Sequence, residues 1–384
     1  MRKPIIKIPP GSNLDAYFMT NRYNTIFQLE EGTYYASNAN SFMDMDYVML
    51  GNGCELIGAG SSLTYVMFSA DPDHLPAGSG QVEFLTAGGR STVATFVRIE
   101  GITVSTPSYH LKKKRVGSVS VHIWCDYSVV RDVQIVGVDG FRPGPTDNPK
   151  VSREGFGLLI NRSGIYGNGT VGSIVEDVSV TAVGDHEGDE IYVCGVYVGM
   201  NQLDGLTFVD RVKVFSASPI PVHASFGFNG NVQAFRISNH GVFNRGIFCD
   251  TGGGHNTTIT QARLTARCVM MEFRGAGVTW KNIELNDSLL TLQPTPGTAY
   301  CAALVVADDG GASFDNVSIN RSTIRVDTSL LADGSPTPLL TDGSDNGRNT
   351  SNCGIFQCRM IGPWRGPTLA STGFSTPNQK PPIK

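Results

Sequence analysis

The chain has 384 residues and a formal net charge of −4, which gives no electrostatic reason to expect a nucleic-acid partner. Glycine accounts for 45 residues and charged side chains for only 17% of the chain. Glycine destabilises a helix interior by about 1 kcal/mol per site, so this composition excludes a helical bundle and suits a chain with many turns. The sequence has no apolar run long enough for a transmembrane helix, and its N-terminus lacks the apolar stretch of a secretory signal.

The eight cysteines are dispersed, and no two of them have the C-x-x-C spacing of a zinc site. We therefore expect mostly reduced, buried thiols, with no metal bound through cysteine and no cofactor.

Residues 1–70 are predicted to form an entry module of capping coils. Residues 26–35 predict a strand, a turn at Glu31-Gly32 and a second strand, and residues 56–66 predict another pair of strands around glycines. The step EGTY at 31–34, followed by LIGAGSSLT at 56–64, resembles the opening coils of pectate-lyase-like, right-handed parallel β-helix proteins. That superfamily contains polysaccharide lyases, glycoside hydrolases, uronan epimerases and phage tailspikes. The resemblance therefore implies a fold and a polysaccharide partner, but no single activity.

A short phrase recurs between residues 100 and 319, in which a polar pair precedes Val or Ile, one further residue and another apolar residue. It reads RDVQI at 131–135, EDVSV at 176–180 and DRVKV at 210–214. Such alternation predicts strands with one buried face, and its repetition predicts a solenoid of stacked coils. The fold class expected is all-β, a single-stranded right-handed parallel β-helix (solenoid) with long loop insertions. Equivalent places in the phrase predict one internal file of Val133, Val178, Val212, Ile283 and Val317.

We expect one structural domain, with the parallel β-helix at 71–362 and a C-terminal tail at 363–384 that is rich in Pro, Gly, Ser and Thr. Insertions at 106–118, 138–156 and 184–190 are the longest departures from the coil. Since they fall in consecutive coils, they are predicted to share one face and to carry the functional site.

The insertion GDHEGDE at 184–190 contains the residues predicted to be catalytic: Asp185, His186, Glu187, Asp189 and Glu190. Two carboxylates about 5–10 Å apart could perform acid/base chemistry on a glycosidic bond. Asp185-His186-Glu187 also resembles the Asp-Pro-His-Glu element of uronan C5-epimerases and lyases, without its proline. Two alternatives stay open for this insertion, a calcium site built from carboxylate oxygens and a solvated acidic loop.

The predicted substrate-binding residues are cationic or aromatic. Lys112, Arg142 and Arg153 could neutralise the carboxylate of an acidic sugar, and Trp124 and Tyr127 could stack on sugar rings. The complete motifs of pectate lyases and polygalacturonases are absent from the sequence.

Two classes of function follow from the resemblance. The first is a virion-associated glycan-binding protein of the phage tailspike or tail-fibre type, with depolymerase activity left open. The alternative is a stand-alone polysaccharide lyase, uronan epimerase or glycoside hydrolase. The expected partner is a polysaccharide, with other virion proteins and a homotrimer as further possibilities. Neither nucleic acid nor membrane insertion is expected, and the expected location is the virion or the extracellular space.

Overall fold

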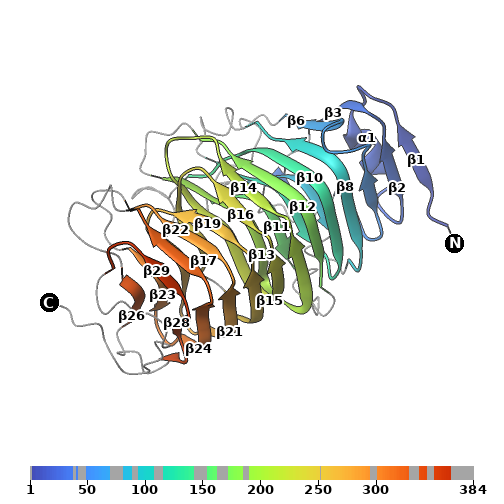
Figure 1. Cartoon of the computed structure of the whole chain (residues 1–384). Coiled ribbons are helices and arrows are strands. Elements are labelled where there is room, and N and C mark those ends of the chain that lie inside the picture. The colour runs from blue at the N-terminus through green and yellow to red at the C-terminus, as the bar shows by residue number, and fades with distance from the viewer. Residues whose placement is uncertain are drawn as a thin grey trace.

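The computed structural model describes residues 2–37, 40–41, 49–69, 81–88, 94–107, 116–141, 154–161, 172–184, 190–250, 252–294, 301–327, 337–343 and 350–364. Within these ranges the chain winds into an elongated stack of coils whose strands pair in parallel from one coil to the next (Figure 1). The predicted all-β parallel β-helix is confirmed. No helix in the described part of the chain is long and apolar enough to cross a membrane.

The stack has three faces, each a parallel sheet. Face 1 consists of β7 (Gln81–Gly88), β9 (Gly117–Trp124), β11 (Gly155–Asn161), the first parts of β13 (Ile191–Asp210) and β15 (Val222–Phe235), β17 (Phe243–Cys249), β20 (Val269–Gly275), β23 (Ala302–Asp308) and β26 (Thr337–Gly343).

Face 2 consists of β1 (Ile5–Ile8), β2 (Ile26–Leu29), β5 (Glu55–Ile57), the first parts of β8 (Val97–Ser105), β10 (Ser128–Val138) and β12 (Ile174–Ala182), the last parts of β13 and β15, β18 (Gly254–Thr260), β21 (Thr279–Asn286), β24 (Ser313–Asn320), β27 (Thr350–Ser351) and β28 (Gly354–Phe356).

Face 3 consists of β3 (Gly32–Ala36), β6 (Thr64–Phe68), the last parts of β8, β10 and β12, β14 (Lys213–Ser216), β16 (Ser238–His240), β19 (Arg263–Ala266), β22 (Leu289–Leu292), β25 (Thr323–Val326) and β29 (Arg359–Ile361). The short strand β4 (Asn40–Ser41) pairs antiparallel with β7.

The helix α1 (Leu14–Thr20) packs against the first coils. Asn13 caps it, because its side chain accepts a hydrogen bond from the backbone N–H of Asp15. Leu14 and Phe18 are buried, and the ring of Phe18 lies 4.9 Å from that of Phe27 on β2 in an edge-on arrangement. An apolar face of this helix therefore covers the core next to the first strands.

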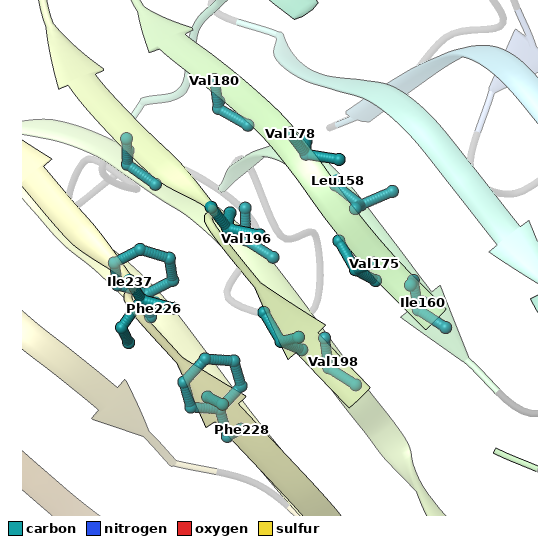
Figure 2. Packing of buried hydrophobic residues seen from close by; sticks show 14 of the residues in the cluster. Leu158, Ile160, Val175, Val178, Val180, Val196, Val198, Phe226, Phe228 and Ile237 are labelled. Carbon is teal, nitrogen blue, oxygen red and sulfur yellow. The ribbon is translucent and has the colours of Figure 1, made fainter. Parts of the chain in front are cut away.

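The core is a continuous column of aliphatic and aromatic side chains inside the coils. In Figure 2, Leu158, Val196 and Phe226 of face 1 lie in the same cluster as Val178 of β12 and Ile237, which lies between β15 and β16. The eight cysteines form no disulfide and six of them are buried, as small apolar side chains would be.

The repeat phrase marks two different corners of the coil, so the prediction of one file is wrong. Val133 pairs directly with Val178. The flanking pairs Glu176–Asp210 and Ser179–Lys213 place Val212 next in the same file. Ile283 instead pairs with Thr257 on one side and Val317 on the other, in a second file. All five predicted residues are buried, but in two files: Val133, Val178 and Val212, and Ile283 and Val317.

The reason lies in the residue that precedes each apolar position. Asp177 and Arg211 have φ of 53°, and Asn282 and Asn316 have φ of 54°. Each of these residues bends the chain in the left-handed region, which Asn and Asp tolerate best among residues with a side chain. Asp177 and Arg211 stand at the bend into face 3, whereas Asn282 and Asn316 stand at an earlier bend of their coils. The same local sequence therefore serves two corners.

Candidate functional site

The outward side of face 1 carries an apolar cluster that is separate from the core. Leu158 and Ile160 point inward, so Leu159 between them points outward. The outer apolar cluster consists of Val119, Phe156, Leu159, Cys194, Tyr197, Ala224 and Phe248, all of them buried. Polar groups lie at both ends of this cluster.

At the end nearer the N-terminus, a carboxylate, an imidazole and an amide form a buried chain. His122 Nδ1 lies 2.8 Å from Glu83 Oε1, and its Nε2 lies 2.9 Å from Asn161 Nδ2. Because a carboxylate only accepts, Nδ1–H donates to Glu83 and Nε2 accepts from Asn161. Asn161 is fully buried, and its Oδ1 has no hydrogen-bond partner. Trp124 packs on the imidazole with ring centroids 4.5 Å apart.

At the other end, polar residues gather where neighbouring strands of face 1 begin. Glu154 and Glu190 directly precede β11 and β13, Tyr192 and His223 are the second residues of β13 and β15, and Asn244 is the second residue of β17. Since parallel strands begin at the same edge of a sheet, these side chains come together although they are far apart in sequence. We call Glu154, Glu190, Tyr192, His223, Asn244 and Arg245 the acid–base group.

Glu190 is the most heavily contacted carboxylate of this group. Its Oε1 lies 3.1 Å from His223 Nδ1, 2.5 Å from Asn244 Nδ2 and 3.7 Å from Arg245 Nη1. Burial acts to raise the pKa of Glu190, but the bond and charge of His223, the bond from Asn244 and the charge of Arg245 outweigh it, and the pKa falls to about 2. Glu190 is therefore a carboxylate over nearly the whole pH range.

Glu154 has the opposite character. Burial, with the added negative charges of Asp250 and Glu190, holds the pKa of Glu154 well above its usual range. Burial also raises the pKa of Asp250. Neighbouring carboxyl groups whose environments drive their pKa values apart are the arrangement that supplies one acid and one base.

His223 lies between aromatic rings and keeps one nitrogen without a partner. Its ring centroid is 4.5 Å from that of Tyr192 and 4.7 Å from that of Phe248. Its Nδ1 lies 3.1 Å from Oε1 of Glu190 and 3.3 Å from Nη1 of Arg245. Nε2 is buried and has no hydrogen-bond partner. Burial and the charges of Glu154, Asp250 and Glu190 raise the pKa of Tyr192, so its hydroxyl stays protonated.

A chain of alternating charges runs from Glu190 across face 1. Arg245 Nε lies 2.5 Å from Glu272 Oε2, and Arg274 Nη1 lies 3.4 Å from the other oxygen of Glu272. Arg274 also forms a fork with Asp309 through Nε at 2.9 Å and Nη2 at 2.8 Å. The order is Glu190, Arg245, Glu272, Arg274, Asp309, and we call it the ion-pair chain.

Of the residues predicted from sequence to be catalytic, the structure places Glu190 in the acid–base group. Asp185, His186, Glu187 and Asp189 lie outside the described residues, and so do the predicted substrate-binding residues Lys112, Arg142 and Arg153. Their roles stay predictions.

The two predicted aromatic binding residues are both described. Trp124 lies on face 1, but it is only 6% exposed and packs on His122. Tyr127 lies between β9 and β10 and stacks on Phe96 with centroids 5.7 Å apart. Trp124 is thus buried, whereas Tyr127 is half-buried, and the sugar-binding roles of both stay predictions.

Sequence reasoning missed the residues that surround Glu190. His223, Arg245 and Glu272 lie in strands that are otherwise mostly apolar, as in VHASF, FNRGIFC and VMMEFRG. A charged residue within a buried strand is costly unless it is paired, so each such position was a signal for a partner on a neighbouring coil.

Metal binding has no support in the described ranges, where no three His, Cys, Asp or Glu side chains gather in an arrangement that could hold an ion. The predicted calcium site, placed at 184–190, falls mostly outside the described residues and stays a prediction.

No protein-family model matches the chain, and no curated protein sequence is similar to it. Among solved structures it is similar to the A-module of the Azotobacter vinelandii mannuronan C-5 epimerase AlgE4, with 13% identity, a TM-score of 0.37 and 90% of each chain covered. It is also similar to the Agl-KA catalytic domain, with 15% identity, a TM-score of 0.39, and coverage of 94% of this chain and 62% of that one. Both likenesses are distant, and neither fixes an activity for this chain.

Proposed function

We propose that the protein binds a polysaccharide on face 1 and cleaves its glycosidic bonds by acid–base catalysis. The observation that supports this most is the opposite pKa shift of two nearby glutamates, raised for Glu154 and lowered to about 2 for Glu190. Glycoside hydrolysis needs one carboxylic acid to protonate the leaving oxygen and one carboxylate to activate water or to attack the sugar.

In this proposal Glu154 is the acid. Its raised pKa keeps a proton on the carboxyl group near neutral pH, ready for transfer to the glycosidic oxygen as the bond breaks. Glu190 is the carboxylate, held in its ionised form by His223, Asn244 and Arg245. The net change is the addition of water across the bond, with the proton of Glu154 replaced from that water.

The acid–base group is within reach of a ligand. Glu154, Tyr192, Asn244 and Arg245 are half-buried, and the side chain of Glu190 is 8% exposed. A glycan could therefore approach the starting edge of these strands.

The test is the release of reducing ends from a panel of bacterial, algal and plant polysaccharides. Glu154→Gln and Glu190→Gln should each lower the rate by about 100-fold or more, the usual contribution of a catalytic acid or base. Glu176→Gln is the matched control, because Glu176 pairs with Arg131 and Arg211 away from face 1. Full activity in both site variants would overturn the proposal.

A second candidate function is the binding of a polysaccharide without its cleavage, as expected for a glycan-binding protein of the tailspike type. Tight binding of one polysaccharide by the parent protein, with no reducing ends released, would support it. The narrower expectations of a virion location, of virion partners and of a homotrimer stay predictions, and so do lyase and epimerase activities.

A further inference from the structure

The outward side of face 3 carries two files of side chains along the C-terminal half of the stack. The strands β14, β16, β19, β22, β25 and β29 pair one after the next (Figure 1). The residue between the two files is buried in most of these coils, as Val214 and Leu264 are, so its neighbours on either side point outward. The first file consists of Lys213, Ser238, Arg263, Leu289, Thr323 and Arg359. The second file holds Phe215, His240, Thr265, Thr291 and Arg325. We call these two files the face 3 strip.

The face 3 strip carries cations without carboxylates. Its cations are Lys213, Arg263, Arg325 and Arg359, all of them exposed. None of them forms an ion pair with another described residue, whereas Arg131 on face 2 pairs with Glu176, and Arg321, just before β25, pairs with Asp287. No member of either file is an aspartate or a glutamate, and Asp327 follows β25 beyond the files. This surface is therefore positive although the whole chain has a net charge of −4.

The cations are spread along the axis of the stack, with hydroxyl groups between them. Neighbouring coils are about 4.8 Å apart, so Lys213 and Arg263, which are two coils apart, are separated by roughly 10 Å along the axis. Arg325 lies two further coils on, and Ser238 and Thr291 lie on the intervening strands. A hydroxyl both donates and accepts a hydrogen bond. The strip therefore matches a ligand that has widely spaced anionic groups and hydroxyls between them.

An aromatic pair lies in the same strip. Phe215 and His240 are neighbours in the second file, and their rings stack with centroids 5.4 Å apart and planes at 17°. His240 is exposed and Phe215 is half-buried. Flat rings of this kind offer an apolar surface with a polar edge, on which the apolar face of a sugar ring can pack.

We infer that the face 3 strip binds an anionic polysaccharide, whose chain runs along the axis of the stack. Its carboxylate or sulfate groups lie at Lys213, Arg263 and Arg325, since an unoccupied guanidinium fork grips such groups through two parallel N–H bonds. A sugar ring packs beside His240. Duplex DNA is a poorer match for the widely spaced cations, because it carries one negative charge about every 1.7 Å of its axis. The strip is separate from the acid–base group on face 1, so this inference goes beyond the proposed cleavage.

Binding is measured by affinity electrophoresis of the full-length protein in gels that contain polygalacturonate, alginate or a sulfated galactan, with dextran as the neutral reference. Glu154→Gln serves as the background, so that the polymer is not cleaved during the run. At least one acidic polymer should retard the protein more than dextran does. Adding Arg263→Gln and Arg325→Gln should weaken that binding by about fivefold or more, because two exposed ion pairs are lost.

The matched control is Lys7→Gln with Lys281→Gln, which removes two positive charges from exposed positions on β1 and β21 of face 2. It should leave the binding within about twofold of its background. Unchanged binding in the face 3 double variant, an equal loss in the face 2 control, or no retardation by any acidic polymer would overturn the inference. Tighter binding of single-stranded DNA or of phosphatidylserine vesicles than of every acidic polymer would also overturn it. Release of reducing ends is scored separately through Glu154 and Glu190, so the proposed cleavage and this inference can fail independently.

A further variant tests whether the ligand is a sugar chain or any polyanion. His240→Ala in the same background removes the exposed ring of the stacked pair and should weaken binding of the acidic polymer by about threefold or more. His255→Ala is the matched control, because His255 lies on β18 of face 2. Unchanged binding in His240→Ala would mean that charge alone holds the polymer, and would overturn the assignment of a polysaccharide.

Discussion

At the scale of single residues, the site depends on three side chains that lower the pKa of one carboxyl group, that of Glu190. Glu190 is contacted by His223, Asn244 and Arg245. Glu154 instead lies among other carboxyl groups, and burial raises its pKa. The two glutamates therefore have very different pKa values, because the surroundings of each carboxyl group shift its pKa.

Glu190→Gln should lower stability in a pH-dependent way. The pKa of Glu190 is about 2 in the folded protein, below its unfolded value of about 4.3, so its contribution is fully present above the unfolded pKa and is lost as the pH falls toward 2. At pH 7 the variant should lose roughly 1–3 kcal/mol, the range for a buried hydrogen-bonded charge. Urea unfolding of parent and variant at pH 7 and pH 3 measures this, and an equal loss at both values would contradict it.

Glu154→Gln should have the opposite effect on stability while it removes activity. A carboxyl group with a raised pKa contributes stability that is full below its unfolded pKa and is lost as the pH rises through the folded value. The amide has no charge to bury, so the variant should unfold at a higher temperature than the parent at pH 8. The two melting temperatures should approach each other at pH 4. A variant less stable than the parent at both pH values would contradict the assignment of Glu154 as a buried acid.

At the scale of the elements, the alternation of apolar and polar residues allowed the strands to be predicted, but not their register. The segments 26–35 and 56–66 form β2, β3, β5 and the start of β6 as expected. Their sequences contain strand formers bounded by glycine turns, which is a local property. Register is not local: the phrase around Val178 and that around Ile283 look alike, and only the count of residues in each coil assigns them to different corners.

Val178→Asp should destabilise the protein by about 3 kcal/mol or more, because it places an unpaired charge among buried aliphatic side chains. Val178 is 1% exposed and packs within the core. Ser179→Asp is the matched control, since Ser179 is the next residue of β12 and points the other way. Thermal melts compare the two, and equal losses would show that the assigned inward face is wrong.

Asn282→Val should cost more stability than Asn282→Gly. Asn282 has φ of 54° and donates through Nδ2 to Asn256 Oδ1 at 3.0 Å. Both variants lose that bond, but only valine must also force a branched side chain into the left-handed region, which adds roughly 1–2 kcal/mol. The difference between the free energies of unfolding of the two variants measures the cost of placing valine in the left-handed backbone conformation. A glycine variant as unstable as the valine variant would assign the whole effect to the hydrogen bond.

At the scale of the whole molecule, coil stacking brings together residues that no sequence window contains. The predicted acidic insertion supplied Glu190 to the site, because a run of carboxylates is visible in the sequence. Glu154, His223 and Arg245 join it only because their strands begin at the same edge of face 1. Coil lengths vary along this chain, so the residues that meet across coils could not be read from spacing alone. The division into 1–70, 71–362 and 363–384 stays a prediction.

The pH dependence of kcat/KM for glycan cleavage tests the acid–base pair most directly. The parent should show a bell-shaped profile, with an acidic limb near pH 2 from Glu190 and an alkaline limb well above the usual glutamate range from Glu154. Any activity that remains in Glu154→Gln should lack that alkaline limb, whereas Glu176→Gln should keep both limbs. An alkaline limb that persists unchanged in Glu154→Gln would contradict the assignment of Glu154 as the acid and, with it, the proposed catalytic pair.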